Sequence, residues 1–252
     1  MYPVLCSWGP FTLYTYGLLL VLGFAAATWL ARRDAHRLPP ARRAIAAGQI
    51  PDFAATALLA GIVGGRLLYV VVQWPDFAAA PRLIPAIWRG GLIWYGGLAG
   101  GLLASWAYLR ARRLRFLPVM DQFIPFGVLG HAIGRIGCFL NGCCYGRPTD
   151  AWYGVWFPGQ PGPVVPTQLL EAAGLVALFF VLRAARSAFR APGQVFGLYL
   201  ASYGALRFVI ELLRGDQARW HGLTLPQLVS LALLPVGWLL FKRFSTAFHA
   251  SK

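Results

Sequence analysis

The sequence predicts an all-α, polytopic membrane protein with seven transmembrane helices, an N-terminus outside and a C-terminus in the cytoplasm. Three observations predict this class. Of the 252 residues, 58% are hydrophobic and 12% are charged, and the mean hydropathy is +0.58, whereas soluble domains carry about 25% charged residues. Seven segments approach the roughly 20 apolar residues that a helix needs to cross a bilayer. Connections rich in basic residues alternate along the chain with connections that contain few.

The seven predicted helices follow one another without internal repeats, so residues 1–252 are expected to form a single domain. The first ten residues carry no basic cluster, and the first apolar segment is long enough to span. No cleavable signal peptide is therefore expected. The fourth and sixth segments are the least purely apolar. The predicted spans cover residues 11–31, 49–74, 91–109, 117–140, 166–183, 194–213 and 225–242.

The basic residues predict the orientation. Fifteen follow the first, third and fifth predicted helices or close the chain, and five lie in the intervening connections. This asymmetry indicates that the crowded side is cytoplasmic. The net charge of +15 is thus explained by topology and by attraction to anionic lipid, and no nucleic-acid partner is expected. The fifteen are Arg32, Arg33, Arg37, Arg42, Arg43, Arg110, Arg112, Arg113, Arg115, Arg183, Arg186, Arg190, Lys242, Arg243 and Lys252, against Arg82, Arg89, Arg147, Arg214 and Arg219.

Three arginines remain inside predicted spans: Arg66, Arg135 and Arg207. An ionisable group at membrane depth costs several kcal/mol, about 2.5–3.5 on insertion scales, and usually marks a functional site. The three helices run outward, so each arginine falls in its outer half, at the depth where the other helices begin. A snorkelling arginine would explain one such residue, but a whole layer predicts a site for an anionic, membrane-resident ligand. The other members of the layer are Tyr14, Tyr16, Trp94, Tyr95, Gln168, Glu171, Tyr203, Glu211 and Arg214.

The sixth predicted helix places Tyr203, Arg207 and Glu211 on one face, because they are spaced i, i+4 and i+8. One interpretation is a structural ion pair between Arg207 and Glu211, which lowers the cost of burying either charge. A paired guanidinium still has N–H donors that suit a phosphate. One turn before Arg135 lies His131, the one histidine of four inside a predicted span. It is interpreted either as a packing residue or as a proton-transfer group.

Glycines and cysteines gather beside the buried arginines. The glycines of residues 61–65 and 96–101 predict close helix packing or space for a ligand, and the sequence leaves both open. A disulfide from Cys6 to Cys143 or Cys144 is conceivable outside the cytoplasm. The Cys-x4-Cys-Cys spacing from Cys138 differs from paired Cys-x2-Cys zinc motifs, so no metal and no other cofactor is expected. These thiols are interpreted either as small packing side chains or, for Cys138, as a nucleophile.

Several motifs resemble the prolipoprotein diacylglyceryl transferases of bacterial inner membranes, and the resemblance runs over nearly the whole chain. The most specific is Gly134-Arg135-x-Gly137-x-Phe139-x-Asn141-Gly142-x-x-x-Gly146-Arg147, which resembles the family signature. The segments 9–17, 64–69 and 166–171 are similar to the family's first, second and fifth helices, and residues 203–214 resemble its functional tyrosine-arginine-glutamate run. The chain carries Tyr95, Cys138 and Cys143 where the family usually has histidine, asparagine and glutamate.

The resemblance implies an enzyme that moves the diacylglyceryl group of phosphatidylglycerol to the lipobox cysteine thiol of a preprolipoprotein, at the outer leaflet of the bacterial inner membrane. The partners implied are phosphatidylglycerol and the preprolipoprotein signal peptide. Transfer to another acceptor and transport of anionic lipid are the alternatives. The expected catalytic residues are Arg135, Arg207, Tyr95 and His131. The expected substrate-binding residues are Tyr16, Arg66, Gly96, Gly97, Gly134, Gly137, Asn141, Gly146, Gln168, Tyr203, Glu211 and Arg214.

Overall fold

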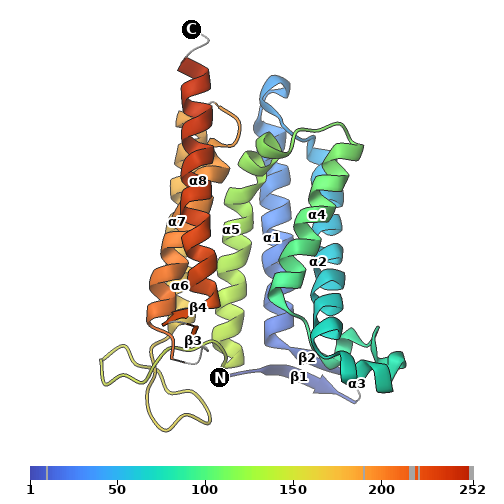
Figure 1. Ribbon diagram of the computed structural model, residues 1–252, viewed down its shortest axis with the longest axis vertical. Coiled ribbons are helices and arrows are strands. Elements are labelled where there is room, and N and C mark those ends of the chain that lie inside the picture. Colours follow the sequence, from blue (N-terminus) through green and yellow to red (C-terminus); the bar gives the residue numbers. More distant parts are fainter. Residues whose placement is uncertain (10, 190, 216–218, 221, 250–252) are drawn as a thin grey trace. The chain divides into compact units, whose positions relative to one another are not determined.

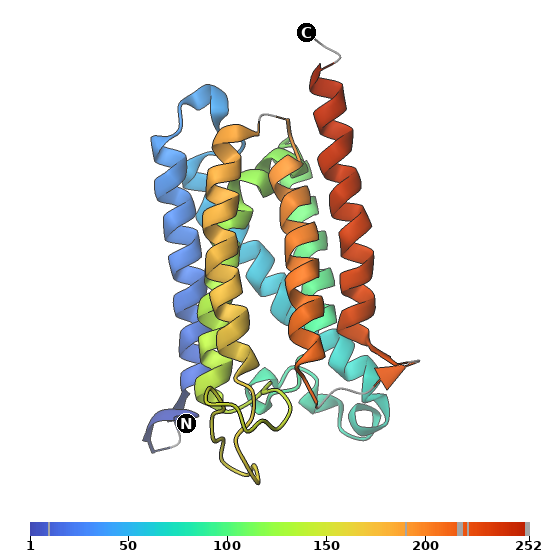
Figure 2. The same ribbon diagram turned by 90° about the vertical axis from the view of Figure 1, so that its left-hand side faces the viewer.

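The computed structural model describes residues 1–252 except 10, 190, 216–218, 221 and 250–252. Arg190 and Lys252 of the charge pattern, and Pro10 of the first motif, therefore lie outside the described residues. The chain is mostly helical and divides into two compact units. The first unit comprises Met1–Ala31 and Met120–Lys252, and the second comprises Arg32–Val119. Figures 1 and 2 show the elements of both.

Six helices of the described residues are long and apolar enough to cross a membrane, which confirms a multi-pass helical architecture. The third predicted span also forms a helix, α4 (Trp94–Ala111), but its 18 residues are not among the six. Each of the other six predicted spans coincides with one of the candidates to within a few residues. The six are Thr15–Arg37, Ala47–Val72, Phe116–Asn141, Thr167–Ala188, Gln194–Leu212 and Leu225–Lys242.

The chain begins with a β-hairpin rather than with a helix, so the predicted helix start at residue 11 is wrong. Strand β1 (Val4–Trp8) pairs antiparallel with β2 (Phe11–Tyr14), and Gly9 turns between them with a φ of +59°. Glycine adopts this left-handed conformation without steric cost. Helix α1 (Thr15–Arg37) then starts at Thr15, whose hydroxyl donates to the Tyr2 carbonyl at 2.5 Å. The apolar residues 11–14 thus extend the hydrophobic run without being helical.

The first unit is an antiparallel set of long helices. Helix α5 (Phe116–Asn141) is followed by a long connection, α6 (Thr167–Ala188), α7 (Gln194–Leu212) and α8 (Leu225–His249). In Figures 1 and 2 the end of α5, the start of α6, the end of α7 and the start of α8 lie at the same end. Before α8, the two-residue strands β3 (Arg219–Trp220) and β4 (Leu223–Thr224) pair antiparallel. Helices α5, α6 and α7 share an apolar core that includes Val128, Leu175 and Val195.

Glycines bring helices of the first unit together. A Cβ built on Gly23 of α1 would lie 2.6 Å from the carbonyl oxygen of Gly130 in α5, and one built on Gly237 of α8 would lie 2.6 Å from that of Gly197 in α7. Helix association in lipid gains little from the hydrophobic effect, so small residues that permit close backbone contact are favoured. Large apolar side chains along the same helices are exposed, as lipid-facing residues are expected to be.

The second unit is organised by the pair α2 (Ile50–Val72) and α4. A Cβ on Gly64 would meet the carbonyl oxygen of Gly96 and would lie 3.0 Å from the Cα of Gly100. The helix-packing interpretation of these glycines is therefore confirmed. Along the chain, α2 is followed by α3 (Trp74–Ala79) and the single 3-10 turns η3 (Pro81–Leu83) and η4 (Ile87–Arg89), and then by α4. Two further 3-10 turns, η1 (Pro40–Arg42) and η2 (Ala47–Gln49), precede α2.

We expect Gly96→Ala to destabilise the second unit, because the added methyl group would come within 2.6 Å of the Leu68 Cβ and closer still to the backbone of Gly64. Overpacking of this kind costs about 1–3 kcal/mol, so the thermal unfolding midpoint in detergent should fall. Gly17→Ala is the matched control, since its Cβ would meet nothing within 4 Å. Equal midpoints for the two variants would contradict the close contact between α2 and α4.

Candidate active site

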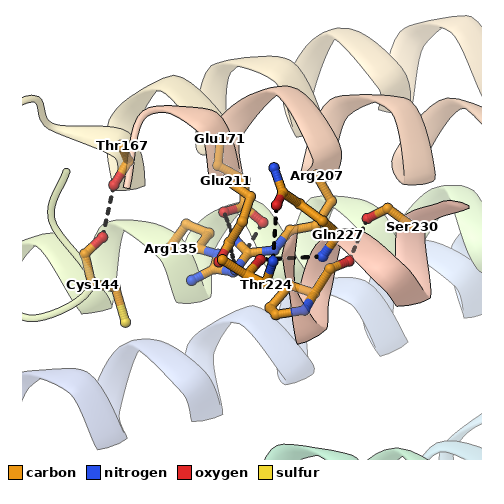
Figure 3. Close-up of polar contacts among 10 residues, drawn as sticks. Arg135, Cys144, Thr167, Glu171, Arg207, Glu211, Thr224, Gln227 and Ser230 are labelled. Carbon is orange, nitrogen blue, oxygen red and sulfur yellow. Dashed lines mark hydrogen bonds and ion pairs between the residues drawn. The ribbon is translucent and has the colours of Figure 1, made fainter. Parts of the chain in front are cut away.

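A network of two arginines and two glutamates joins α5, α6 and α7 in the first unit (Figure 3). Glu171 lies at its centre: Oε1 accepts a hydrogen bond from Nη2 of Arg135 at 2.9 Å, and Oε2 accepts one from Nη1 of Arg207 at 3.0 Å. The Glu171 side chain is 2% exposed and the two arginine side chains are 15% and 12% exposed. One buried carboxylate therefore holds two guanidiniums that come from different helices.

Glu211 completes the network from α7. Its Oε2 accepts a hydrogen bond from Nη2 of Arg207 at 2.7 Å, which confirms the ion pair predicted from the i, i+4 spacing. The Glu211 side chain is fully buried. Two positive and two negative charges thus balance at membrane depth, which is how charges are tolerated away from water.

Each charge is placed by its position on a helix. Glu171 lies near the N-terminus of α6, where the helix dipole stabilises a negative charge. Glu211 lies one residue before the end of α7, where the dipole opposes it, so its contact with Arg207 offsets an unfavourable position. Arg135 lies about two turns before the end of α5. The three helix ends gather in one place, and this brings the four side chains together.

The connection after α5 is fastened to α6 and α7 through its backbone. The Thr167 hydroxyl donates to the Cys144 carbonyl at 2.7 Å, and Nε2 of Gln168 donates to the Cys143 carbonyl at 2.5 Å. The Arg147 amide donates to the carbonyl of Leu213, the residue after α7, at 2.9 Å. A Cβ on Gly146 would lie 2.6 Å from the Leu213 carbonyl oxygen. The connection can therefore pass this close to the end of α7 only with glycine at position 146.

Some buried polar atoms in and beside the network have no hydrogen-bond partner among the described residues. Among the described residues, Nε of Arg135, Oε1 of Glu211 and Oε1 of Gln168 are buried without a hydrogen-bond partner. Buried polar atoms are normally satisfied, and a guanidinium has five N–H donors. Arg135 uses Nη2 for Glu171, and its Nε is left without a partner among the described residues. The Arg135 donor is therefore positioned for a bound anion, and the two acceptor oxygens are positioned for a hydrogen-bond donor of a substrate.

Three cysteines lie beside the network. The sulfurs of Cys138, Cys143 and Cys144 are all within 4.8 Å of one another, although the linear spacing predicted no metal-binding cluster. All four cysteines of the chain are free thiols, so the conceivable disulfide from Cys6 does not form. Hydrogen bonds from the Cys138 and Cys143 thiols lower the pKa of the Cys144 thiol, and the charges of Arg214 and Arg135 act in the same direction.

Tyr203 and His131 contribute packing. Their rings meet edge to face at 5.5 Å between centroids, and Tyr203 also stacks on Tyr199 at 5.7 Å. Tyr203 belongs to the buried core, and His131 is partly buried. The packing interpretation of His131 is thus supported by a specific contact. Its proton-transfer role stays a prediction. The motivation for that role is that His131 lies on the same face of α5 as Arg135.

The other predicted residues of the first unit lie near the ends of α5 and α7. Gly134 and Gly137 receive side chains from α1: a Cβ on Gly134 would lie 3.3 Å from Leu20, and one on Gly137 would lie 3.3 Å from the Tyr16 ring. Asn141 is the last residue of α5 and is half-buried. Arg214 is buried, three residues after Glu211.

Arg66 belongs to the second unit, and its guanidinium is used by the protein itself. It donates to the carbonyl groups of Leu83, Ile84, Gly90 and Gly91 at 2.6, 2.8, 2.7 and 3.2 Å. All four carbonyl groups belong to the segment between α3 and α4, so Arg66 holds the backbone of this segment in place and has a structural role. Arg66 does not belong to the network of Arg135, Glu171, Arg207 and Glu211, and its contact with substrate stays a prediction. Tyr95, Gly96 and Gly97 also lie in the second unit, where Gly96 and Gly97 face Gly64 and Gly61 of α2.

Glu171 was expected in the polar layer but was not among the predicted site residues. Its helix carries no second charge at i±4 that would pair with it, so only contacts between helices reveal the bridge. Thr167 was missed as well, because a threonine at a helix start is common and carries no signal for a contact with a distant backbone.

Comparisons with known proteins cover most of the chain. A sequence model of the family described as prolipoprotein diacylglyceryl transferase matches residues 3–243. The phosphatidylglycerol–prolipoprotein diacylglyceryl transferase of Methylococcus capsulatus is 37% identical over 243 residues, which cover 94% of this chain and 87% of that one. The enzyme of the same name from Vibrio cholerae is 37% identical over 94% of this chain and 89% of its own, and that from Clostridium tetani is 33% identical over 96% and 97%.

We expect Glu171→Gln to destabilise the protein more than Glu211→Gln, because Glu171 pairs with two arginines and Glu211 with one. Removing one partner of a buried ion pair costs about 3–5 kcal/mol. The comparison uses thermal unfolding midpoints in detergent, with Asp150→Asn as an exposed control that also removes one carboxylate. An equal or smaller shift for Glu171→Gln would refute the bridging role.

Proposed function

The chain belongs to the prolipoprotein diacylglyceryl transferase family, and we propose that the network of Arg135, Glu171, Arg207 and Glu211 is its active site. The protein is an enzyme that transfers the diacylglyceryl group of phosphatidylglycerol to a prolipoprotein. The observation that carries the site assignment is the buried Nε of Arg135, which has no partner among the described residues. An anionic phosphate is the group that this donor suits.

The reaction breaks the bond between a glycerol carbon of the lipid and a phosphate oxygen. A sulfur nucleophile of the acceptor forms the new bond to that carbon, and glycerol phosphate leaves with the electron pair. Negative charge grows on the departing phosphate, so preorganised guanidiniums in a water-poor site stabilise the transition state. Glu171 and Glu211 hold Arg135 and Arg207 in position before the lipid binds, which removes the cost of arranging them during the reaction.

The acceptor group is the lipobox cysteine thiol of the preprolipoprotein, and the site lies toward the outer leaflet of the bacterial inner membrane. The distribution of basic residues supports this orientation, with the N-terminus outside. Helix α4 is the seventh span: at 1.5 Å per residue its 18 residues reach about 27 Å, close to the roughly 30 Å hydrocarbon thickness. The network lies near the ends of α5 and α7, which are the outer ends in this orientation.

Arg135→Lys and Arg207→Lys should each lose most of the transfer activity, by about 10²-fold or more, as losing one preorganised donor does. An ammonium is a point charge and cannot reproduce the forked contact of a guanidinium with Glu171 and a phosphate together. The assay uses purified protein, phosphatidylglycerol vesicles and a lipobox peptide, with exposed Arg82→Lys as the control. Near-normal turnover in both variants, at normal expression, would remove these arginines from the site.

His131 is the predicted base that accepts the thiol proton. His131→Gln should then lower the rate by about 10²–10⁴ and abolish the acidic limb of the pH–rate profile. Tyr95→Phe is measured in parallel, because Tyr95 was the other predicted catalytic residue outside the arginines. A His131→Gln enzyme with the parent's rate and profile would leave His131 with its packing role against Tyr203 alone.

A further inference from the structure

The three-cysteine cluster has the composition and the spacing of a metal site. Cys138 comes from the last turn of α5, and Cys143 and Cys144 come from the connection that follows it. Their sulfurs lie within 4.8 Å of one another. Tetrahedral zinc with Zn–S bonds of about 2.3 Å places its sulfurs about 3.8 Å apart. The thiols would therefore have to approach by at most about 1 Å, which side-chain rotation can provide.

The backbone holds the cluster in this arrangement. Cys144 has a φ of +63°, a left-handed conformation that is uncommon for a residue other than glycine and is often found at functional sites. The carbonyl groups of Cys143 and Cys144 are each held by a side chain from the start of α6, Gln168 and Thr167. The left-handed Cys144 and these two hydrogen bonds together fix the backbone that carries Cys143 and Cys144.

We propose that Cys138, Cys143 and Cys144 bind a thiophilic divalent ion of the zinc class, and that its fourth position takes the acceptor cysteine of the prolipoprotein. The inference rests on the function proposed above and extends it to the activation of the acceptor. Thiolates favour zinc and other soft ions, and three protein ligands with one open position are the arrangement of catalytic zinc.

The location suits the reaction. Cys138 lies three residues after Arg135 on α5, so the two side chains are neighbours on the helix surface. A thiol bound to the ion would lie beside the arginine that we assign to the lipid phosphate. The nucleophile and the leaving group would then be held next to each other, which is the positioning that a displacement at carbon requires.

The step balances without an oxidant. Coordination removes the proton from the acceptor thiol, and the proton passes to a base, for which His131 is the candidate on the same helix. The coordinated sulfur forms a bond to the glycerol carbon, the bond from that carbon to the phosphate oxygen breaks, and glycerol phosphate leaves. The thioether product is a weaker ligand than a thiolate, so it dissociates from the ion.

Cadmium binding to the reduced, full-length protein tests the metal site, because cadmium–thiolate bonds give an ultraviolet charge-transfer band. We expect one ion per chain, and a loss of affinity in Cys138→Ser, Cys143→Ser and Cys144→Ser that exceeds the roughly 10–100-fold typical of outer-shell changes. Cys6→Ser, at an exposed strand position, should bind as the parent does. Failure of the parent to bind, or equal losses in Cys6→Ser, would overturn the proposal.

Adding a lipobox peptide to the cadmium-loaded parent tests the open position. The band should grow by about a third as three thiolates become four, and a peptide with serine in place of its cysteine should leave the band unchanged. Identical responses to both peptides would overturn the fourth-ligand assignment.

Activity separates this inference from the proposed function. Chelation should abolish transfer from phosphatidylglycerol and zinc should restore it, which avoids relying on cysteine variants that misfold. Full transfer by metal-free protein would keep the proposed function and overturn the metal site. A peptide-dependent cadmium band without transfer under any condition would support the metal site and contradict the proposed function.

Discussion

The architecture of the first unit depends on a single buried carboxylate. Glu171 binds Arg135 on one side and Arg207 on the other, and without it two guanidiniums would face each other at membrane depth. Like charges in a medium of low dielectric repel strongly, and an unpaired buried charge is costly. The bridge therefore fixes the positions of α5, α6 and α7 relative to one another along their axes. The same bridge keeps both arginines oriented for an anion, so stability and function share one interaction.

Close contacts at glycines hold the apolar helices together in lipid. The hydrophobic effect cannot distinguish a helix neighbour from a lipid chain, so association relies on close backbone packing and on polar contacts. Gly23 with Gly130 and Gly197 with Gly237 supply the first in one unit, and Gly64 with Gly96 supplies it in the other. Polar side chains are then free to concentrate in one layer instead of being spread along every helix interface.

The connection after α5 places the chemistry at one end of the bundle. Its backbone carbonyls are hydrogen-bonded to the start of α6, and its glycine at position 146 passes close to the end of α7. A signature that combines arginine, glycine, asparagine and cysteine over fourteen residues is therefore a structural unit: the arginine meets the network, the glycines admit neighbouring backbones, and the cysteines converge. The spacing of these residue types is dictated by where the helix ends and the chain turns back.

Hydrophobic length, charge distribution and i, i+4 spacing are local properties, so the membrane class, the approximate spans, the family resemblance and the Arg207–Glu211 pair could be predicted from the sequence. It also singled out Arg135 and the glycine faces. Three features became visible only in the folded chain: Glu171 bridges to two other helices, backbone carbonyls bind Arg66, and three cysteines converge. The folded chain also shows that residues 11–14 form a strand. Each of these depends on which chain segments meet in space, and hydrophobic periodicity carries no information about a partner many residues away.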